Sequence, residues 1–315
     1  MFIAAGFAVG QASTTVYQPD VNGNQVAAVG LATSTSGSSS ERTELSSSIN
    51  GRLVPLEKQE ERVLSQTADS KVTERTISKF DQNGTLISVE KVKTEQIKHG
   101  DGSSTTHVET FHSDVNGAMA PTGRETTESR TVGTTTTTNT LIEKPSMSGA
   151  FETAEKRESV KQVQGDTTNE SETVYRRDTN GSLVTAEQRS REEKKTNGTT
   201  VENVGIFTPS DNGRMQLQQQ HVTTTAQNPD GSMTIDSTYF SRDAMGAPQS
   251  TDGTQHPYAQ QTIARSKDAS GNVVETMTVR HPTISNPDRL GDPQQVSKIV
   301  CTGKCDAPAT PVVVP

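Results

Sequence analysis

Side chains that could carry catalysis or bind a metal are sparse in this 315-residue chain and form no reactive pattern. His107 and His112 are five residues apart, so on a strand they face opposite sides and cannot share a metal ion. The sequence holds no GxSxG, HExxH or P-loop motif. Neighbouring carboxylates such as Glu192 and Glu193 are expected to be solvated rather than to form an acid–base pair. We therefore expect no enzyme, no cofactor and no bound metal.

Two cysteines, Cys301 and Cys305, lie close together in the segment CTGKC. A loop of this kind closes as a disulfide when the Cα atoms come within about 7 Å. An even number of cysteines suits an exported chain. Two thiols without a neighbouring histidine supply half of a zinc site. The sequence therefore predicts a local disulfide.

An Asp-x-Asn-Gly segment, as in Asp81–Gly84, is the third candidate for chemistry. It resembles the start of a calcium-binding loop, but the rest of such a loop, including its bidentate glutamate, is missing. Asn-Gly is the strongest short signal for a β-hairpin, because both residues accept positive φ. The aspartate can accept hydrogen bonds from its own turn. Turn chemistry is therefore favoured over calcium binding.

This turn returns every 32 or 33 residues, which is typical of an array of one repeated unit. A second glycine falls midway between successive turns, as at Gly133 and Gly165, so each repeat is predicted to be one hairpin with strands of about 12 residues. The predicted repeat turns are Asn50, Gly51, Asn83, Gly84, Asn116, Gly117, Gly149, Asn180, Gly181, Asn212, Gly213 and Gly246.

Large apolar side chains gather beside these turns. One column stands two residues after the repeat glycine, and a second stands about six residues before it. Together they predict a thin apolar seam along one side of the array. Its members are Leu53, Leu86, Met119, Phe151, Leu183, Met215, Phe111, Tyr175, Phe207 and Phe240.

A further column of glutamates stands six residues after the repeat glycine, as at Glu57, Glu155 and Glu187. In an antiparallel meander the intervening strand would supply the cations that pair with it. The candidates for this role are Lys71, Arg75, Lys98 and Arg130. Such pairs would each contribute only about 0.2–1 kcal/mol.

Composition argues against an ordinary globular enzyme, which is kept only as a second rival. Hydrophobic residues make up 29% of the chain, aromatic residues 3%, and tryptophan is absent, whereas a typical domain is about 45–50% apolar. Such a chain is either a disordered spacer or an ordered repeat that needs little core, and the regular period favours the repeat. The net charge of −8 argues against nucleic acid as a partner and against polybasic attraction to anionic lipid.

Four segments are predicted from these patterns. Residues 1–12 look like the end of a signal peptide, and 13–274 hold the hairpin repeats. Residues 275–305 form a cap with the two cysteines, and 306–315 form an extended tail in which Val312, Val313 and Val314 could serve as a donor strand. The apolar run at the start is shorter than the ~20 residues that cross a bilayer, so no membrane span is expected.

The pattern aromatic–Asp–x–Asn–Gly–x–apolar, as in Tyr175 to Leu183, resembles the YD/RHS-type repeats of bacterial surface and toxin-shell proteins. It is also similar to secreted threonine-rich repeat proteins of soil bacteria. The resemblance covers about Tyr17 to Val274. It implies an antiparallel β array exported to the cell surface, and no activity.

The fold predicted from these observations is all-β: an array of long antiparallel hairpins forming an elongated meander or a coiled sheet. A flat polar sheet would have sticky edges, so it must either curl or pair with other copies. We expect an exported, extracellular or cell-surface structural protein whose copies pair edge to edge into a homo-polymeric fibre. The alternative is a monomeric adhesin or carbohydrate-binding module that takes a surface glycan through Tyr239, Phe240 and Tyr258.

Overall fold

The computed structural model describes residues 12–19, 25–35, 40–49, 52–114, 117–241, 257–283 and 286–302. These residues form strands throughout, and the described part contains no helix long and apolar enough to cross a membrane. The strands are β1 (Ala12–Pro19), β2 (Gln25–Thr35), β3 (Ser40–Ile49), β4 (Arg52–Gln66), β5 (Ser70–Phe80), β6 (Leu86–Lys98), β7 (Ser104–Ser113), β8 (Met119–Val132), β9 (Thr135–Pro145), β10 (Phe151–Gln164), β11 (Thr167–Arg177), β12 (Leu183–Thr196), β13 (Thr199–Pro209), β14 (Met215–Gln227), β15 (Met233–Ser241), β16 (Pro257–Lys267), β17 (Val273–Arg280), β18 (Pro282–Thr283), β19 (Asn286–Leu290) and β20 (Gln294–Thr302).

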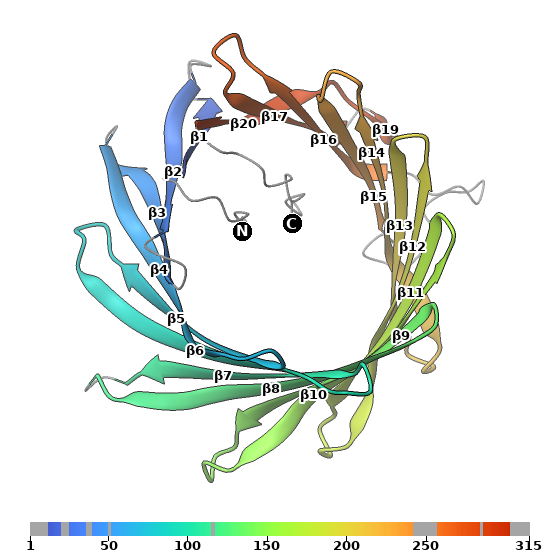
Figure 1. Cartoon of the computed structure of the whole chain (residues 1–315). Helices are drawn as coiled ribbons and strands as arrows, with labels where there is room; N and C mark the ends of the chain where they lie inside the picture. The colour runs from blue at the N-terminus through green and yellow to red at the C-terminus, as the bar shows by residue number, and fades with distance from the viewer. Residues whose placement is uncertain are drawn as a thin grey trace.

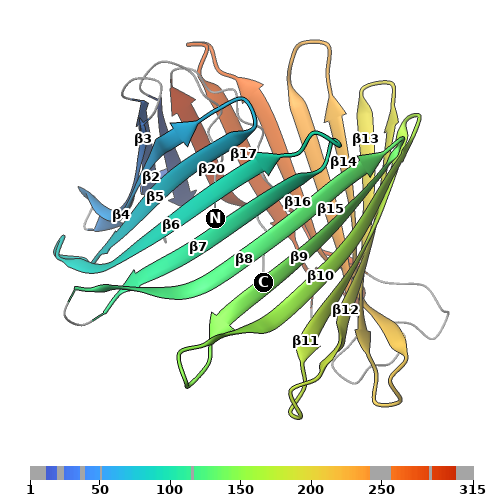
Figure 2. The ribbon, with the colours of Figure 1, turned by 60° about the horizontal axis from the view of Figure 1, so that its bottom comes forward.

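Eighteen of these strands form one antiparallel sheet in which each strand from β1 to β17 pairs with the next. The meander is joined at its ends, because β20 pairs with both β17 and β1. Figure 1 shows the strands arranged around a ring. The strands run obliquely to the axis of the cylinder (Figure 2), as barrel closure requires. The short hairpin of β18 and β19 lies beside β16.

Asparagine–glycine turns close many of the hairpins. At the turn between β5 and β6, the Asp81 carboxylate accepts hydrogen bonds from the backbone N–H groups of Asn83 and Thr85, both at 2.8 Å. Gly84 follows with φ of 81°, a value in which an L side chain is strained. Among the described residues only Asn197 is a non-glycine with positive φ, at 47°. Most turns are therefore closed by an aspartate or serine and one left-handed glycine, and the expectation of two left-handed residues fits only Asn197-Gly198.

A β-bulge recurs shortly after the turn glycine in successive hairpins. Between β11 and β12, Val174 faces Glu187 and Tyr175 faces Thr185, which leaves Ala186 without an opposite residue. The same displacement leaves Ala154 unopposed on β10. Bulges increase the local twist of a strand and are used to curve sheets. A bulge repeated at one level around the ring therefore helps to close the cylinder.

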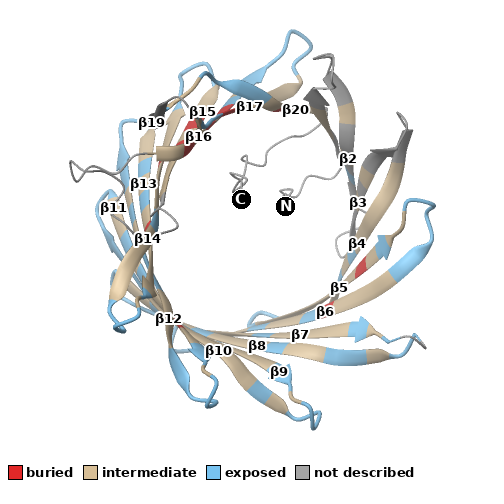
Figure 3. Ribbon diagram, turned by 180° about the vertical axis from the view of Figure 1, so that it is seen from behind, coloured by how far each residue is buried: buried red, intermediate tan, exposed pale blue. Residues whose placement is uncertain are grey.

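The register divides the strand residues into two faces, since directly opposite residues share a face and alternate residues do not. All of the buried side chains among the described residues fall on the same face. Figure 3 marks the buried residues in red on the ribbon. Side chains on the concave side of a curved sheet converge, so we assign this face to the inside of the cylinder. The buried set is Ile77, Val92, Val174, Thr223, Ile235, Ser237, Ala259, Gln261, Ile263, Val279 and Ser297.

The prediction of an all-β array of long antiparallel hairpins is confirmed at this level. The predicted alternatives for its shape were an elongated meander and a coiled sheet. The sheet instead curls until its two ends pair, because β1 takes β20 as its second neighbour. A closed ring satisfies the edge hydrogen bonds that a flat polar sheet would expose.

Candidate functional site

The glutamate column that follows the repeat turns lies on the inner face. The bulge shifts the alternation by one residue, so that Glu155 and Glu187 point inward while the apolar residues nearer the turn point outward. Arg157 and Arg176 donate to Glu155 at 2.5 and 2.7 Å. Arg130, one of the expected cation partners, lies on the other face, opposite Thr137. The predicted pairing is thus wrong for this residue.

Ion pairs cover the inner wall from β10 to β13. Arg189 on β12 donates to Glu172 across the ladder at 3.2 Å and to Glu187 on its own strand. On the same strand, Lys195 contacts Glu193 at 3.2 Å. We call this set the charge ladder. Its members are Glu155, Arg157, Glu170, Glu172, Arg176, Glu187, Arg189, Arg191, Glu193, Lys195 and Glu202.

Arg191 is the most connected member of the charge ladder. Its guanidinium contacts Glu202 on β13 at 2.5 Å, Glu193 at 2.7 Å and Glu170 on β11 at 3.6 Å. Glu193 and Glu202 stand directly opposite each other on neighbouring strands, a like-charge arrangement that is unfavourable without a cation. Arg191 supplies that cation.

A different composition covers the inner wall between β8 and β9. Thr127 and Thr140 share a hydrogen bond of 3.0 Å, and Thr131 and Thr136 share one of 2.9 Å. Ser129 and Thr138 form the rung between them at 3.2 Å. The cylinder is therefore lined by hydroxyl groups on one side and by paired charges on another, and both linings favour contact with water.

The apolar seam lies on the outer face at the rim of the Asp-x-Asn-Gly turns. Phe111 stands opposite Pro121, and Phe207 stands opposite Leu217. Cations lie over two of its rings, with Arg124 at 4.2 Å from the centre of the Phe151 ring and Lys156 at 5.8 Å from that of Tyr175. We call this outward-facing ring the apolar belt. Its described members among the predicted seam residues are Leu86, Phe111, Met119, Phe151, Tyr175, Leu183, Phe207, Met215 and Phe240.

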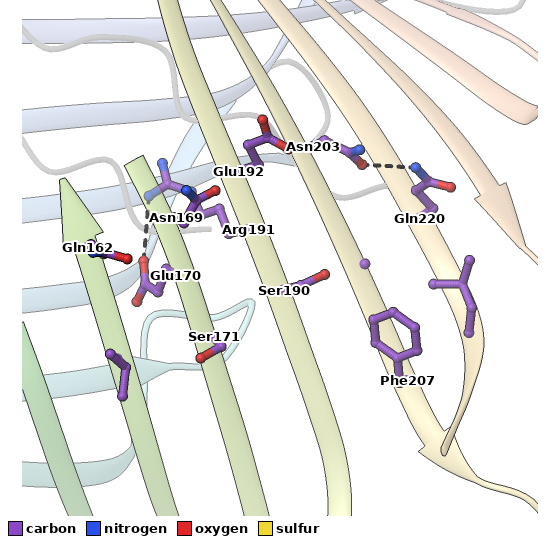
Figure 4. A pocket seen from close by; sticks show the side chains of 13 residues that line it. Gln162, Asn169, Glu170, Ser171, Ser190, Arg191, Glu192, Asn203, Phe207 and Gln220 are labelled. Carbon is purple, nitrogen blue, oxygen red and sulfur yellow. Dashed lines mark hydrogen bonds and ion pairs between the residues drawn. The ribbon is translucent and has the colours of Figure 1, made fainter. Parts of the chain in front are cut away.

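A shallow groove of about 410 Å³ crosses the outer wall from β10 to β14 (Figure 4). Ser171, Ser190 and Gly205 stand in one row across three strands and form its floor. A Cβ on Gly205 would come within 3.1 Å of the Phe207 ring and 3.0 Å of the Ser190 hydroxyl oxygen. The glycine therefore allows the Phe207 ring to lie over the sheet.

The aromatic residues considered for glycan binding are not arranged as an exposed platform. Tyr239 lies on the inner face, and its ring centre is 5.7 Å from that of His221 and 6.3 Å from that of Tyr258. Phe240 lies on the opposite face. No group of three or more His, Cys, Asp or Glu side chains that could hold a metal ion occurs in the described part of the chain.

Asp81 and Asp268, each in a turn between two strands, have lowered pKa values. Backbone hydrogen bonding from Thr85 is the main cause that holds the pKa of Asp81 below the ordinary value of 3.8. At the turn between β16 and β17, the hydrogen bond from the Asn272 side chain is the main cause for Asp268. The ionised carboxylates of Asp81 and Asp268 therefore stabilise their turns.

Several predicted residues lie outside the described residues: Asn50, Gly51, Asn116, Gly246, Cys305 and Val312 to Val314. Leu53 is the second residue of β4, and its side chain is also outside the described part. Cys301 lies near the end of β20, opposite Thr14. The disulfide with Cys305 and the donor strand therefore remain predictions, as do the predicted segment boundaries and the absence of enzyme activity.

Most of the charge ladder was missed by sequence reasoning. The signal that could have revealed it is the alternation Glu170-x-Glu172 before a turn and Arg189-x-Arg191 after it, at nearly equal distances from Gly181. An antiparallel hairpin places such residues opposite each other. The register confirms the pairings Glu172–Arg189 and Glu170–Arg191.

Comparison with known proteins gives a likeness of fold and no family. No family model matches the chain, and no curated protein matches it. The structure of Salmonella typhi OmpF in complex with daunomycin aligns with 92% of this chain and 95% of its own, at 9% identity and a TM-score of 0.51. Vibrio cholerae OmpT aligns with 93% of this chain and 97% of its own, at 8% identity and a TM-score of 0.36. The first likeness shows a β-barrel of the porin type.

This fold overturns the predicted fibre. Fibre assembly needed free strand edges, and each of the 18 strands of the ring has a neighbour on both sides. The likeness to an outer-membrane barrel also contradicts the homo-polymer, the adhesin or carbohydrate-binding alternative and its surface glycan. The exclusion of a membrane span was wrong as well, since it required a helix-length apolar run, and barrels cross membranes with strands. The resemblance to YD/RHS-type repeats remains a prediction.

Proposed function

We propose that this protein is a water-filled β-barrel conduit for polar solutes at the bacterial cell surface, associated with an outer membrane. The observation that carries this proposal is the closed ring of 18 strands with an ion-paired and hydroxyl-lined inner wall. Barrels of about 16–18 strands are wide enough to leave an aqueous channel. A polar interior is typical of such channels.

The apolar belt is the part of the outer wall with the composition to contact lipid. Aromatic rings at one level, with cations such as Arg124 and Lys156 beside them, are suited to the boundary between lipid and water. The rows beyond the belt carry charges, including the Arg62–Glu74 ion pair at 2.6 Å. A charge facing lipid at the bilayer centre costs about 2–4 kcal/mol. The belt is therefore the part of the outer wall where contact with lipid costs least.

Conductance of the purified full-length chain in planar lipid bilayers tests the proposal. A conduit gives discrete, reproducible current steps, and each step grows with salt concentration. Vesicle flotation is measured in parallel to show that the chain has associated with lipid. Protein that is folded by circular dichroism and floats with vesicles, yet gives no current steps, would contradict the conduit.

A variant in the apolar belt tests whether this part of the outer wall contacts lipid. Phe151 lies on the outer face with Arg124 over its ring, so Phe151→Asp places a charge where lipid contact is proposed. We expect it to reduce flotation severalfold while β-structure is retained. Thr137→Asp is the control, because Thr137 lies on the same face away from the belt, opposite Val160 and Arg130. If both variants float with vesicles to the same extent as the unaltered chain, the apolar belt does not contact lipid.

A further inference from the structure

We infer that Arg191 sets the ion selectivity of the conduit by neutralising the charge ladder, so that the unaltered chain discriminates little between cations and anions. This inference rests on the proposed conduit. It concerns a property of the lumen that neither the fold nor the comparisons assign. Its basis is the arrangement of three carboxylates around one guanidinium.

The first step is the position of Arg191 on the inner wall. It stands opposite Glu170 on one side and Val204 on the other. The same face carries Val174, which is 1% exposed, and Thr223, which is 8% exposed. The Arg191 side chain is 33% exposed, so its charge interacts with ions in the lumen as well as with its partners.

The second step is the unfavourable pair that Arg191 compensates. Glu193 and Glu202 are directly opposite each other, and Glu202 has Thr223 as its neighbour on the far side. Lys195 also contacts Glu193, but its side chain is 66% exposed and its contact is longer, at 3.2 Å. Arg191 is therefore the main cation between the two carboxylates.

The third step is the consequence of removing it. Without Arg191, Glu193 keeps its contact with Lys195, whereas Glu170 and Glu202 lose their ion pairs with Arg191. Rings or clusters of one sign in a pore concentrate the opposite ion. The lumen would then favour cations. Removing Glu202 instead would bring the charge ladder, which holds one more carboxylate than cations, to balance and would weaken any preference for cations.

The test is the reversal potential of the full-length chain in planar bilayers under a potassium chloride gradient. Salt is kept near 0.1 M, where charges act over about 10 Å. We expect Arg191→Gln to raise the potassium-to-chloride permeability ratio about twofold or more, and Glu202→Gln to lower it. The double variant, which removes one charge of each sign, is expected to return the ratio to that of the unaltered chain.

Arg62→Gln is the matched control. Arg62 forms an ion pair of the same kind with Glu74 at 2.6 Å, but on the outer face. It should leave the permeability ratio unchanged. If Arg191→Gln does not fold, Lys195→Gln takes its place and is expected to shift the ratio in the same direction by a smaller amount.

The outcomes separate the two proposals. Current steps of normal size with an unchanged ratio in Arg191→Gln, or in Lys195→Gln where it is used, overturn the role of Arg191 and leave the conduit standing. An equal shift in Arg62→Gln also overturns it, because the effect would not belong to the lumen. A lack of current in the unaltered chain overturns the conduit, and the selectivity inference falls with it.

Discussion

Two stretches of the inner wall share one strand pattern and differ in what they contain. From β10 to β13 the wall is a ladder of glutamates and arginines that keeps much of its exposure, as with Arg189 at 42%. From β14 to β17 it is packed, with Ile235 and Ile263 opposite each other and each 6% exposed. Burial of apolar area contributes far more free energy than exposed ion pairs do. The comparison therefore suggests that β14–β17 stabilises the ring and that β10–β13 shapes the lumen.

Some polar groups in the packed stretch pair with one another, while Gln261 Oε1 and Glu275 Oε2 are buried without a hydrogen-bond partner among the described residues. Thr223 and Ser237 share a buried hydrogen bond of 3.0 Å, and Gln261 donates through its side-chain nitrogen to the sulfur of Met277. A buried polar group that loses its partner costs about 1–3 kcal/mol. The packed stretch is thus sensitive to change at polar and apolar positions alike, unlike the charge ladder.

The largest expected effect on the free energy of unfolding is at Ile263. Ile263→Ala removes a side chain that is buried between Ile235 and Met277 on neighbouring strands. We expect it to lower the free energy of unfolding by about 2–5 kcal/mol, measured by urea titration of the circular dichroism signal. A loss no larger than that of a surface variant such as Thr137→Ala would show that this wall is not a core.

A smaller effect is expected in the charge ladder. Arg189→Gln breaks contacts to Glu172 and Glu187, but the guanidinium is 42% exposed and screened by water. We expect a loss of about 0.2–1 kcal/mol by the same titration. A loss equal to that of Ile263→Ala would erase the proposed division between the two stretches.

The smallest expected effect on stability is at the turn between β16 and β17 in the packed stretch, and it depends on pH. The pKa of Asp268 is lowered chiefly by the hydrogen bond from Asn272, so its ionised form stabilises the folded chain above the ordinary value of 3.8. That contribution is lost as the pH falls below 3.8 through the folded-state pKa. We expect the urea midpoint of the unaltered chain to fall more between pH 5 and pH 3 than that of Asp268→Ala. Equal falls would mean that this carboxylate does not support the turn.

The hairpin array could be predicted from the sequence because the turns are local. An Asp-x-Asn-Gly segment defines a turn through its own backbone and side chain, whatever surrounds it. Closure of the ring could not be predicted, because it depends on β1 meeting β20, which are far apart in the sequence. The direction of the seam also escaped prediction. The bulge at positions such as Ala186 shifts the alternation, so Leu183 points outward while Glu187 points inward.

The most direct test of the account is a cross-link between β1 and β20. Val16 and Ile299 stand directly opposite each other on these strands. Val16→Cys and Ile299→Cys are combined in a chain whose Cys301 and Cys305 are replaced by serine, with Ile235→Cys and Ile263→Cys as the control pair from adjacent strands. After mild oxidation, mass spectrometry should find a disulfide within one monomer for both pairs. A disulfide in the control pair, with only intermolecular links or none between positions 16 and 299, would contradict the closed barrel.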